Sequence, residues 1–137
     1  GGYEAGFFLY TNDTDLALRL IASGWGVHGD LSLIVWHDCA TAVRRPTRWF
    51  RLAGRNRVWL ARRHLPWPQA CVAAVAGWMD AHRRAGWRAN DHAATLAGVA
   101  AGVFGSPPRI DPRQRCGAGP FWTMARLLVG SVKRRKA

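Results

Sequence analysis

The chain has 137 residues, 49% of them hydrophobic, which is enough for one domain with a core and argues against global disorder. Its 20 Lys and Arg against 8 Asp and Glu give a net charge of +12, which predicts attraction to polyanions such as nucleic acid, an anionic membrane face or phosphorylated substrates. Cys39, Cys71 and Cys116 form no Cys-x-x-Cys pair, so neither a zinc knuckle nor a disulfide framework is indicated, and a reducing, cytoplasmic setting fits best.

The first residues of the chain and the length of its apolar runs indicate whether a signal peptide or a membrane span is to be expected. Residue 1 is Gly and the first methionine is Met79, so we expect a fragment whose N-terminal portion is missing. No signal peptide is indicated, because Gly1 to Arg19 lacks a basic leader before its apolar part. The longest apolar run, Ala70 to Met79, is far shorter than the roughly 18 residues of a membrane span, so none is expected.

Three short segments of the first half are predicted to be strands. Phe7 to Tyr10 is apolar and aromatic, which favours a buried strand or a loop packed on one. Trp25 to Val27 and the β-rich run from Leu31 to Trp36 are the other two, and the last ends at His37. We therefore expect a mixed α/β arrangement here.

A helix is predicted between the first two strands. Asp13 or Thr14 can cap it, and Gly24 ends it. Asp15 and Arg19 lie four residues apart with the acid first, the favourable order for a helical ion pair. The residues expected on its apolar face are Leu16, Leu20 and Ile21.

From Cys39 onward the pattern becomes helical. Pro46 suits the first turn of a helix that ends before Pro66 and carries apolar residues and Asn56 at three-and-four spacing. Eight arginines and no acid lie between residues 44 and 63. Two more helices are predicted over 69–84 and 91–104, then an irregular segment, a last amphipathic turn or two over 121–129 and a basic tail over 133–136. The remaining histidines are expected to be ordinary surface or boundary residues: His28, His64, His82 and His92.

Several short motifs follow one another along the first half of the chain. They are Gly2-Tyr3-Glu4, Phe7-Phe8-Leu9-Tyr10, Asn12-Asp13-Thr14-Asp15-Leu16-Ala17-Leu18-Arg19, Gly24-Trp25, Trp36-His37 and Arg55-Asn56-Arg57. In this order they resemble the C-terminal half of family 2 glycosyltransferases of the rhamnosyl- and galactofuranosyl-transferase-like branch. That resemblance implies a GT-A fold, an α/β mixed sheet followed by a helical extension. Residues 1–66 would be the acceptor-side part of the catalytic domain, and residues 67–137 the extension with its basic tail.

The resemblance also implies an activity and a base. The full enzyme would transfer a sugar, with inversion, from a nucleotide-diphosphate sugar donor to a saccharide or lipid-linked acceptor in cell-envelope polysaccharide synthesis. Asp13 matches the family's catalytic aspartate, and a carboxylate can accept the proton of an acceptor hydroxyl. Asn12 stands where Glu is common, which removes one charge beside the base. Asn12, Asp15, Arg19 and Trp36 are assigned to acceptor binding and support. A plain helix cap remains the alternative for Asp13.

His37 is assigned by the same resemblance to a divalent metal, Mn²⁺ or Mg²⁺, shared with residues of an Asp-x-Asp motif that this chain lacks. A structural role is the alternative. The donor nucleotide would bind to the half of the enzyme that is missing here, so this fragment alone is expected to be inactive.

The arginines have two functional interpretations beside a merely solvated face. Arg44, Arg45, Arg55 and Arg57 could hold donor or acceptor phosphates, or dock peripherally on the anionic inner membrane face. A competing class is a basic nucleic-acid-binding module, although no helix-turn-helix, RNP-like or zinc-finger signature appears and no specific nucleic acid is expected. A third class is a helical interaction domain that uses residues 69–104.

Overall fold

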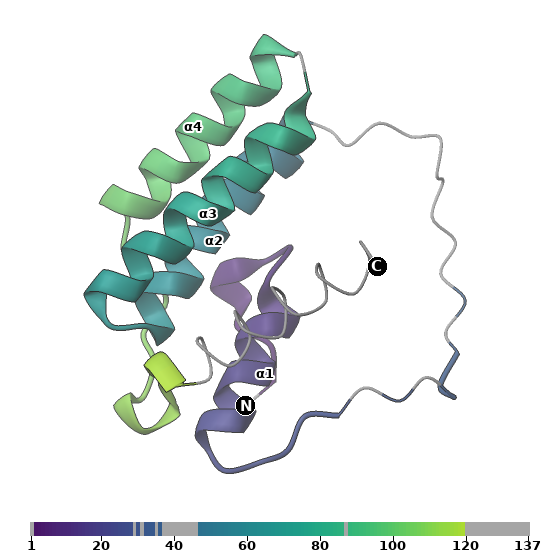
Figure 1. Cartoon of the computed structure of the whole chain (residues 1–137), viewed down its shortest axis with the longest axis vertical. Coiled ribbons are helices and arrows are strands. Elements are labelled where there is room, and N and C mark those ends of the chain that lie inside the picture. Colours follow the sequence, from purple (N-terminus) through teal and green to yellow (C-terminus); the bar gives the residue numbers. More distant parts are fainter. Residues whose placement is uncertain are drawn as a thin grey trace, which may run out of the picture.

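A computed structural model of the chain describes residues 2–28, 30, 32–34, 36, 47–86 and 88–119, without the side chains of residues 84 and 85. Four α-helices lie within this part: α1 (Asn12–Ala22), α2 (Thr47–His64), α3 (Trp67–Ala85) and α4 (Ala89–Phe104). Two 3₁₀ turns flank them, η1 (Ala5–Phe7) and η2 (Pro112–Gln114). Figure 1 shows α2, α3 and α4 packed side by side, with α1 and the N-terminal segment beside one end of α2.

The predicted α/β class and GT-A mixed sheet are wrong, because no strand forms in the described part of the chain, which is an all-α bundle. At Phe7 to Tyr10 a 3₁₀ turn and a loop replace the expected strand. The φ angles of Phe8 and Tyr10 are 56° and 67°, a left-handed backbone that cannot continue a strand. Trp25 to Val27 forms no strand either, nor do the described residues of the segment expected over 31–36.

The helix predicted between Pro46 and Pro66 and those over 69–84 and 91–104 are confirmed, with ends shifted by a few residues, whereas the turn expected over 121–129 lies outside the described residues. α2 begins directly after Pro46 and ends before Pro66, as the fixed φ of proline dictates. The predicted domain division after residue 66 coincides with the short turn between α2 and α3, and these two helices pack on each other.

Glycines set the close packing of α2 on α4, the most extensive contact between helices in the described structure. A Cβ atom at Gly98 would lie 2.1 Å from the backbone oxygen of Arg51, and one at Gly102 would lie 2.9 Å from that of Arg55. Backbone meets backbone at both positions, so only glycine permits this approach.

The core around α2 mixes apolar and polar side chains. Phe7, Phe50 and Val58 are buried, and the Phe7 and Trp59 rings meet edge to face with centroids 6.4 Å apart. Fully buried polar side chains lie among them: Asp15, Asn56, His64, Asp91 and Thr95. The expected apolar face of α1 is wrong in part, since Leu20 and Ile21 are exposed while Asp15 and Arg19 are buried.

Candidate functional site

The loop before α1 is held by one side chain of α2. Asn56 is fully buried, and its Nδ2 donates to the backbone oxygens of Phe7 at 2.8 Å, Leu9 at 2.5 Å and Tyr10 at 3.0 Å. Arg55 Nε donates to Asn56 Oδ1 at 2.9 Å and thereby fixes the orientation of the amide. Because an amide side chain satisfies carbonyls that a strand would offer to a neighbour, the loop needs no sheet.

The same loop has a strained backbone. Thr11, like Phe8 and Tyr10, has a positive φ, here 64°, and three such non-glycine residues within four positions are uncommon. Backbone of this kind persists only where the surroundings enforce it, and it gathers at functional sites. Exposed aromatic surface lies beside it: Arg48 stands over the Phe8 ring at 5.3 Å, and the Tyr10 and Trp49 rings meet edge to face.

Asp13 lies in the first turn of α1, directly after this loop, and its carboxylate is exposed. The predicted capping role is wrong for both Asp13 and Thr14, because the cap position is Thr11 and no side-chain capping bond forms there. Its hydrogen bonds are local: Asp13 Oδ1 accepts from the Thr14 backbone N–H at 2.8 Å and from the Thr14 hydroxyl at 3.5 Å. One face of the carboxylate therefore stays turned to solvent.

Asp15, two residues later, faces the interior. Its Oδ2 accepts from Arg19 Nε at 2.9 Å, which confirms the predicted i, i+4 pair. Its Oδ1 lies 2.9 Å from Arg63 Nε and 2.8 Å from His64 Nε2. Burial by itself would raise the pKa of Asp15, but hydrogen bonds from His64 and Arg19 and the charge of Arg63 outweigh it and lower that pKa below its usual value. The carboxylate is thus the ionised centre of a buried cluster.

This buried cluster joins four segments of the chain. Arg63 Nη1 donates to the backbone oxygens of Pro108 at 2.7 Å and Arg109 at 2.9 Å, and Arg63 Nη2 lies 3.3 Å from Glu4 Oε2. Arg19 Nη2 donates to the backbone oxygen of Gly2 at 2.7 Å. The N-terminal segment, α1, α2 and the loop after α4 are therefore fixed around one carboxylate.

Sequence reasoning missed two members of this arrangement. His64 is 1% exposed, so its assignment as a surface or boundary residue is wrong. Arg63 was counted only among the basic residues of its helix. For Asn56 the sequence does hold an indication. Its amide lies on the apolar side of α2 at three-and-four spacing, where a buried polar residue needs hydrogen-bond partners.

The arginines of α2 are mostly engaged inside the molecule. Arg57 Nη2 lies 2.8 Å from Asp80 Oδ2, and Arg57 Nη1 donates to the Gly77 oxygen at 3.0 Å. Arg55 Nη2 donates to the Gly6 oxygen at 3.3 Å, with its guanidinium 4.3 Å above the Trp59 ring. Arg62 Nη1 bonds the last carbonyls of α4 and the Gly105 oxygen at 2.6 to 2.9 Å. Phosphate or membrane contact by Arg55 and Arg57 stays a prediction, and both would have to exchange these partners.

The remaining residues predicted for the site lie away from the buried cluster or outside the described residues. Trp36 is 93% exposed, and Asn12 is half-buried beside Asp13. His37, Arg44 and Arg45 lie outside the described residues. Within the described ranges no three His, Cys, Asp or Glu side chains gather as metal ligands, so we derive no step through a metal, and the Mn²⁺ or Mg²⁺ assignment remains a prediction.

No family model matches the chain, and neither curated proteins nor solved structures give a significant match. Together with the all-helical structure, this overturns the resemblance to family 2 glycosyltransferases. None of the helices in the described part is long and apolar enough to cross a membrane.

Proposed function

We propose that this chain contributes the proton-accepting carboxylate of a sugar-transfer reaction, with Asp13 acting on the acceptor hydroxyl. One observation carries the proposal: an exposed carboxylate follows directly on a strained loop that the buried Asn56 amide of α2 holds in place. Thr14 engages Asp13 Oδ1, and Oδ2 is the oxygen that would act on a ligand.

The position of Asp13 is supported by the buried cluster. Residues two apart on a helix point to different sides, so anchoring Asp15 inside keeps Asp13 directed outward. A preorganised base loses little freedom when the acceptor binds, and such general-base catalysis contributes about 10²- to 10⁴-fold in rate.

The surface around Asp13 suits a saccharide. In the loop that precedes Asp13, the half-buried Tyr10 ring and the face of the exposed Phe8 ring away from Arg48 can stack on the C–H side of a sugar ring. The neighbouring Asn12 amide can both donate to and accept from hydroxyl groups. These groups support recognition of a polyhydroxylated acceptor and leave the donor sugar open.

The test is sugar transfer by a polypeptide that carries this sequence. UDP- and dTDP-hexoses serve as donors and methyl glycosides as acceptors, with products detected by mass spectrometry. We expect Asp13→Asn to lower kcat about 10²- to 10⁴-fold while the donor KM stays within twofold. Asp111→Asn, at another exposed aspartate that bonds a nearby backbone N–H, is the matched control and should keep full activity. Wild-type turnover in Asp13→Asn would refute the proposal.

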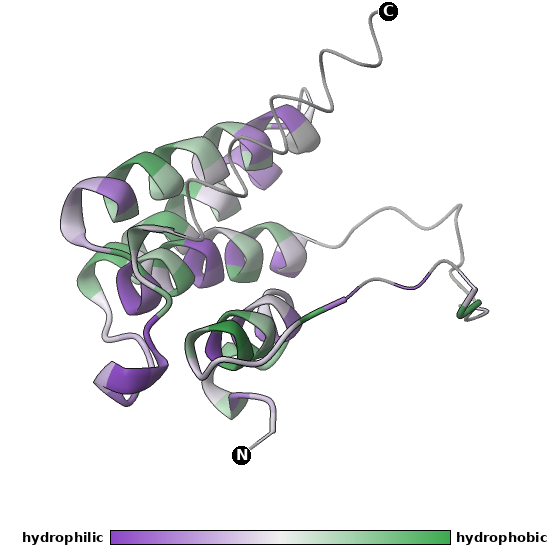
Figure 2. Ribbon diagram, turned by 60° about the horizontal axis from the view of Figure 1, so that its bottom comes forward, coloured by the Kyte–Doolittle hydropathy of each residue, from purple (hydrophilic) through white to green (hydrophobic). Residues whose placement is uncertain are grey.

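A second candidate function is peripheral binding to an anionic membrane. Val72, Val75 and Met79 are more than half exposed and form one stripe along α3, which continues into exposed Arg83. Figure 2 shows apolar residues running along this helix. An apolar stripe next to basic residues is typical of a helix lying in the membrane interface. Nucleic-acid binding is less favoured, because four arginines of α2 already have intramolecular partners.

Vesicle cosedimentation tests this candidate. Wild type should pellet with phosphatidylcholine vesicles that contain 30% phosphatidylglycerol and stay in the supernatant with pure phosphatidylcholine. Val75→Ser should lower the fraction of protein that pellets with the phosphatidylglycerol-containing vesicles. Equal binding to both vesicle types, or to neither, would exclude the candidate.

A further inference from the structure

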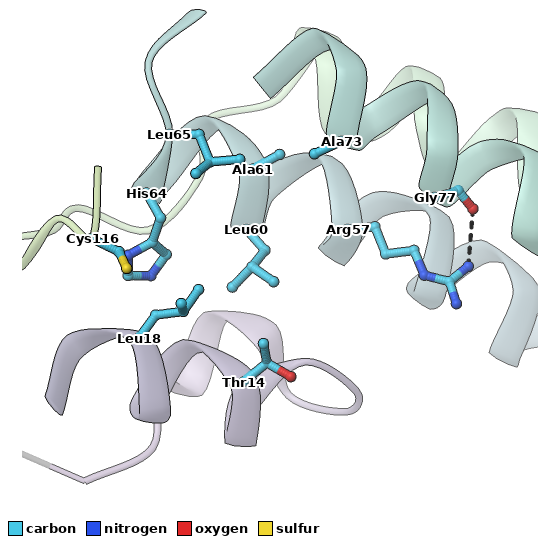
Figure 3. Close-up of a pocket in the computed structure, with 10 residues that line it drawn as sticks. All are labelled: Thr14, Leu18, Arg57, Leu60, Ala61, His64, Leu65, Ala73, Gly77 and Cys116. Atoms are coloured by element: carbon cyan, nitrogen blue, oxygen red, sulfur yellow. Dashed lines mark hydrogen bonds between the residues drawn. The ribbon is translucent and has the colours of Figure 1, made fainter. Parts of the chain in front are cut away.

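An apolar cavity of about 410 Å³ lies between α1, α2, α3 and the segment after η2. This volume falls within the range of about 300–1,000 Å³ of small-molecule sites. Its walls are largely aliphatic, including Leu18, Leu60 and Leu65, while His64 and Cys116 stand together at one end (Figure 3). Asp13 does not line it, so the cavity is separate from the site proposed above.

His64 presents an unused basic nitrogen here. Its Nε2 lies 2.8 Å from the Asp15 carboxylate, and an ionised carboxylate accepts a hydrogen bond, which places the proton on Nε2. In the neutral imidazole, Nδ1 is the nitrogen that keeps a lone pair. It is fully buried and has no hydrogen-bond partner among the described residues. A buried acceptor without a partner is uncommon and calls for a ligand or a reaction.

Two hydrogen bonds, donated by the residues on either side of Cys116, hold it against the end of α2. The Gly117 N–H donates to the backbone oxygen of His64 at 2.9 Å, and Arg115 Nε donates to that of Arg63 at 3.0 Å. Figure 3 draws the Cys116 sulfur beside the His64 ring. Burial raises the pKa of the Cys116 thiol, so it carries its proton at neutral pH and needs a base to react.

We propose that Cys116 is an S-acylation site, with His64 as its base, Asp15 orienting His64, and the cavity receiving the aliphatic chain of an acyl thioester. Nucleophile, base and orienting carboxylate follow one another in the order that activates cysteine and serine nucleophiles, once the thiol comes within hydrogen-bond reach of the free Nδ1. The aliphatic walls select the chain, since moving each methylene out of water into an apolar cavity is favourable.

The reaction is a thioester exchange. His64 Nδ1 takes the thiol proton while Cys116 Sγ attacks the thioester carbonyl, and a new S–C bond forms. The original S–C bond breaks, and the departing thiolate takes the proton from His64. The reactants are one thiol and one thioester, the products are again one thiol and one thioester, and no atom changes its oxidation state.

The experiment incubates the full chain with octanoyl-CoA or acetyl-CoA and follows each cysteine by mass spectrometry of its peptides. Exposed Cys71 is the internal control. We expect Cys116 to be acylated at least tenfold faster than Cys71 by octanoyl-CoA, and by a smaller factor when acetyl-CoA is used. His64→Gln keeps a donor for Asp15 and removes the base, so it should slow Cys116 about 10²-fold or more and leave Cys71 unchanged.

Two further measurements keep the proposal falsifiable if His64→Gln does not fold. Leu60→Trp, which fills the cavity, should abolish the preference for octanoyl-CoA. In the wild type, octanoate should protect Cys116 but not Cys71 from iodoacetamide. The proposal is overturned if Cys116 reacts no faster than Cys71, or if cavity filling and octanoate both leave its rate unchanged.

Discussion

Replacing Asp15 by Asn tests the buried cluster with almost no change of shape. The Asp15 side chain has no exposed surface, and the Arg19 and Arg63 side chains are 11% and 3% exposed. Removing the one charge they share leaves two guanidinium groups buried without it. Breaking such a buried pair costs about 3–5 kcal/mol. Because Arg63 keeps Glu4 and Arg19 keeps the Gly2 carbonyl, we expect the lower end, about 3 kcal/mol.

Urea unfolding followed by far-UV circular dichroism measures this loss. Asp13→Asn is the matched control, because it makes the same chemical change on the exposed side of the same helix and should alter the free energy of unfolding by less than about 0.5 kcal/mol. A loss of about 3 kcal/mol would remove a large part of a typical stability of 5–15 kcal/mol. If the two variants unfold within about 1 kcal/mol of each other, the cluster gives no net stability, and the argument that it fixes α1 fails.

Three further predictions follow from the packing. The pKa of Asp15 is lower in the folded state, so the contribution of Asp15 to stability is complete above its unfolded pKa of about 3.9 and is lost as the pH falls through its folded pKa. Urea unfolding at several pH values should show wild type losing stability over that acid range, and Asp15→Asn should lack this loss. Gly98→Ala should lower the free energy of unfolding by about 1–3 kcal/mol, because the new methyl meets backbone, whereas Gly77→Ala meets only the flexible Arg57 side chain and should be near neutral; equal melting temperatures would contradict this. Asn56→Asp replaces the donor with a carboxylate facing carbonyls, so hydrogen exchange should accelerate at residues 7–11 while α3 keeps its protection; uniform exchange across both would count against the local role of Asn56.

The helices of the second half could be predicted because their signals are local. Proline at the boundaries of α2 and apolar residues at three-and-four spacing act within a turn or two. The first half could not be predicted in this way. The aromatic run at residues 7–10 has the composition of a strand, but its carbonyls bond to an amide that lies 46 to 49 positions further along the chain.

The charged residues show the same limit. Arg19 was expected to pair with Asp15, which is a local relation and is confirmed. That Arg63 and His64 complete the cluster depends on how α2 meets α1, and no pattern within either helix encodes it. The arginine-rich helix suggested an external ligand, whereas its guanidinium groups mainly bond carbonyls and carboxylates of the same molecule.

The long reach of the bonds from α2 to the N-terminal segment has a consequence for the order of assembly. α2, α3 and α4 are consecutive and joined by short turns, so their association closes only small loops. To reach α2, the N-terminal segment must close loops of 46 to 59 residues, the separations of Tyr10 from Asn56 and of Glu4 from Arg63. We therefore expect the three helices to associate first and the segment that carries Asp13 to dock last. In the native state it would detach first, so the chain could lose its candidate site while most of its helix remains folded.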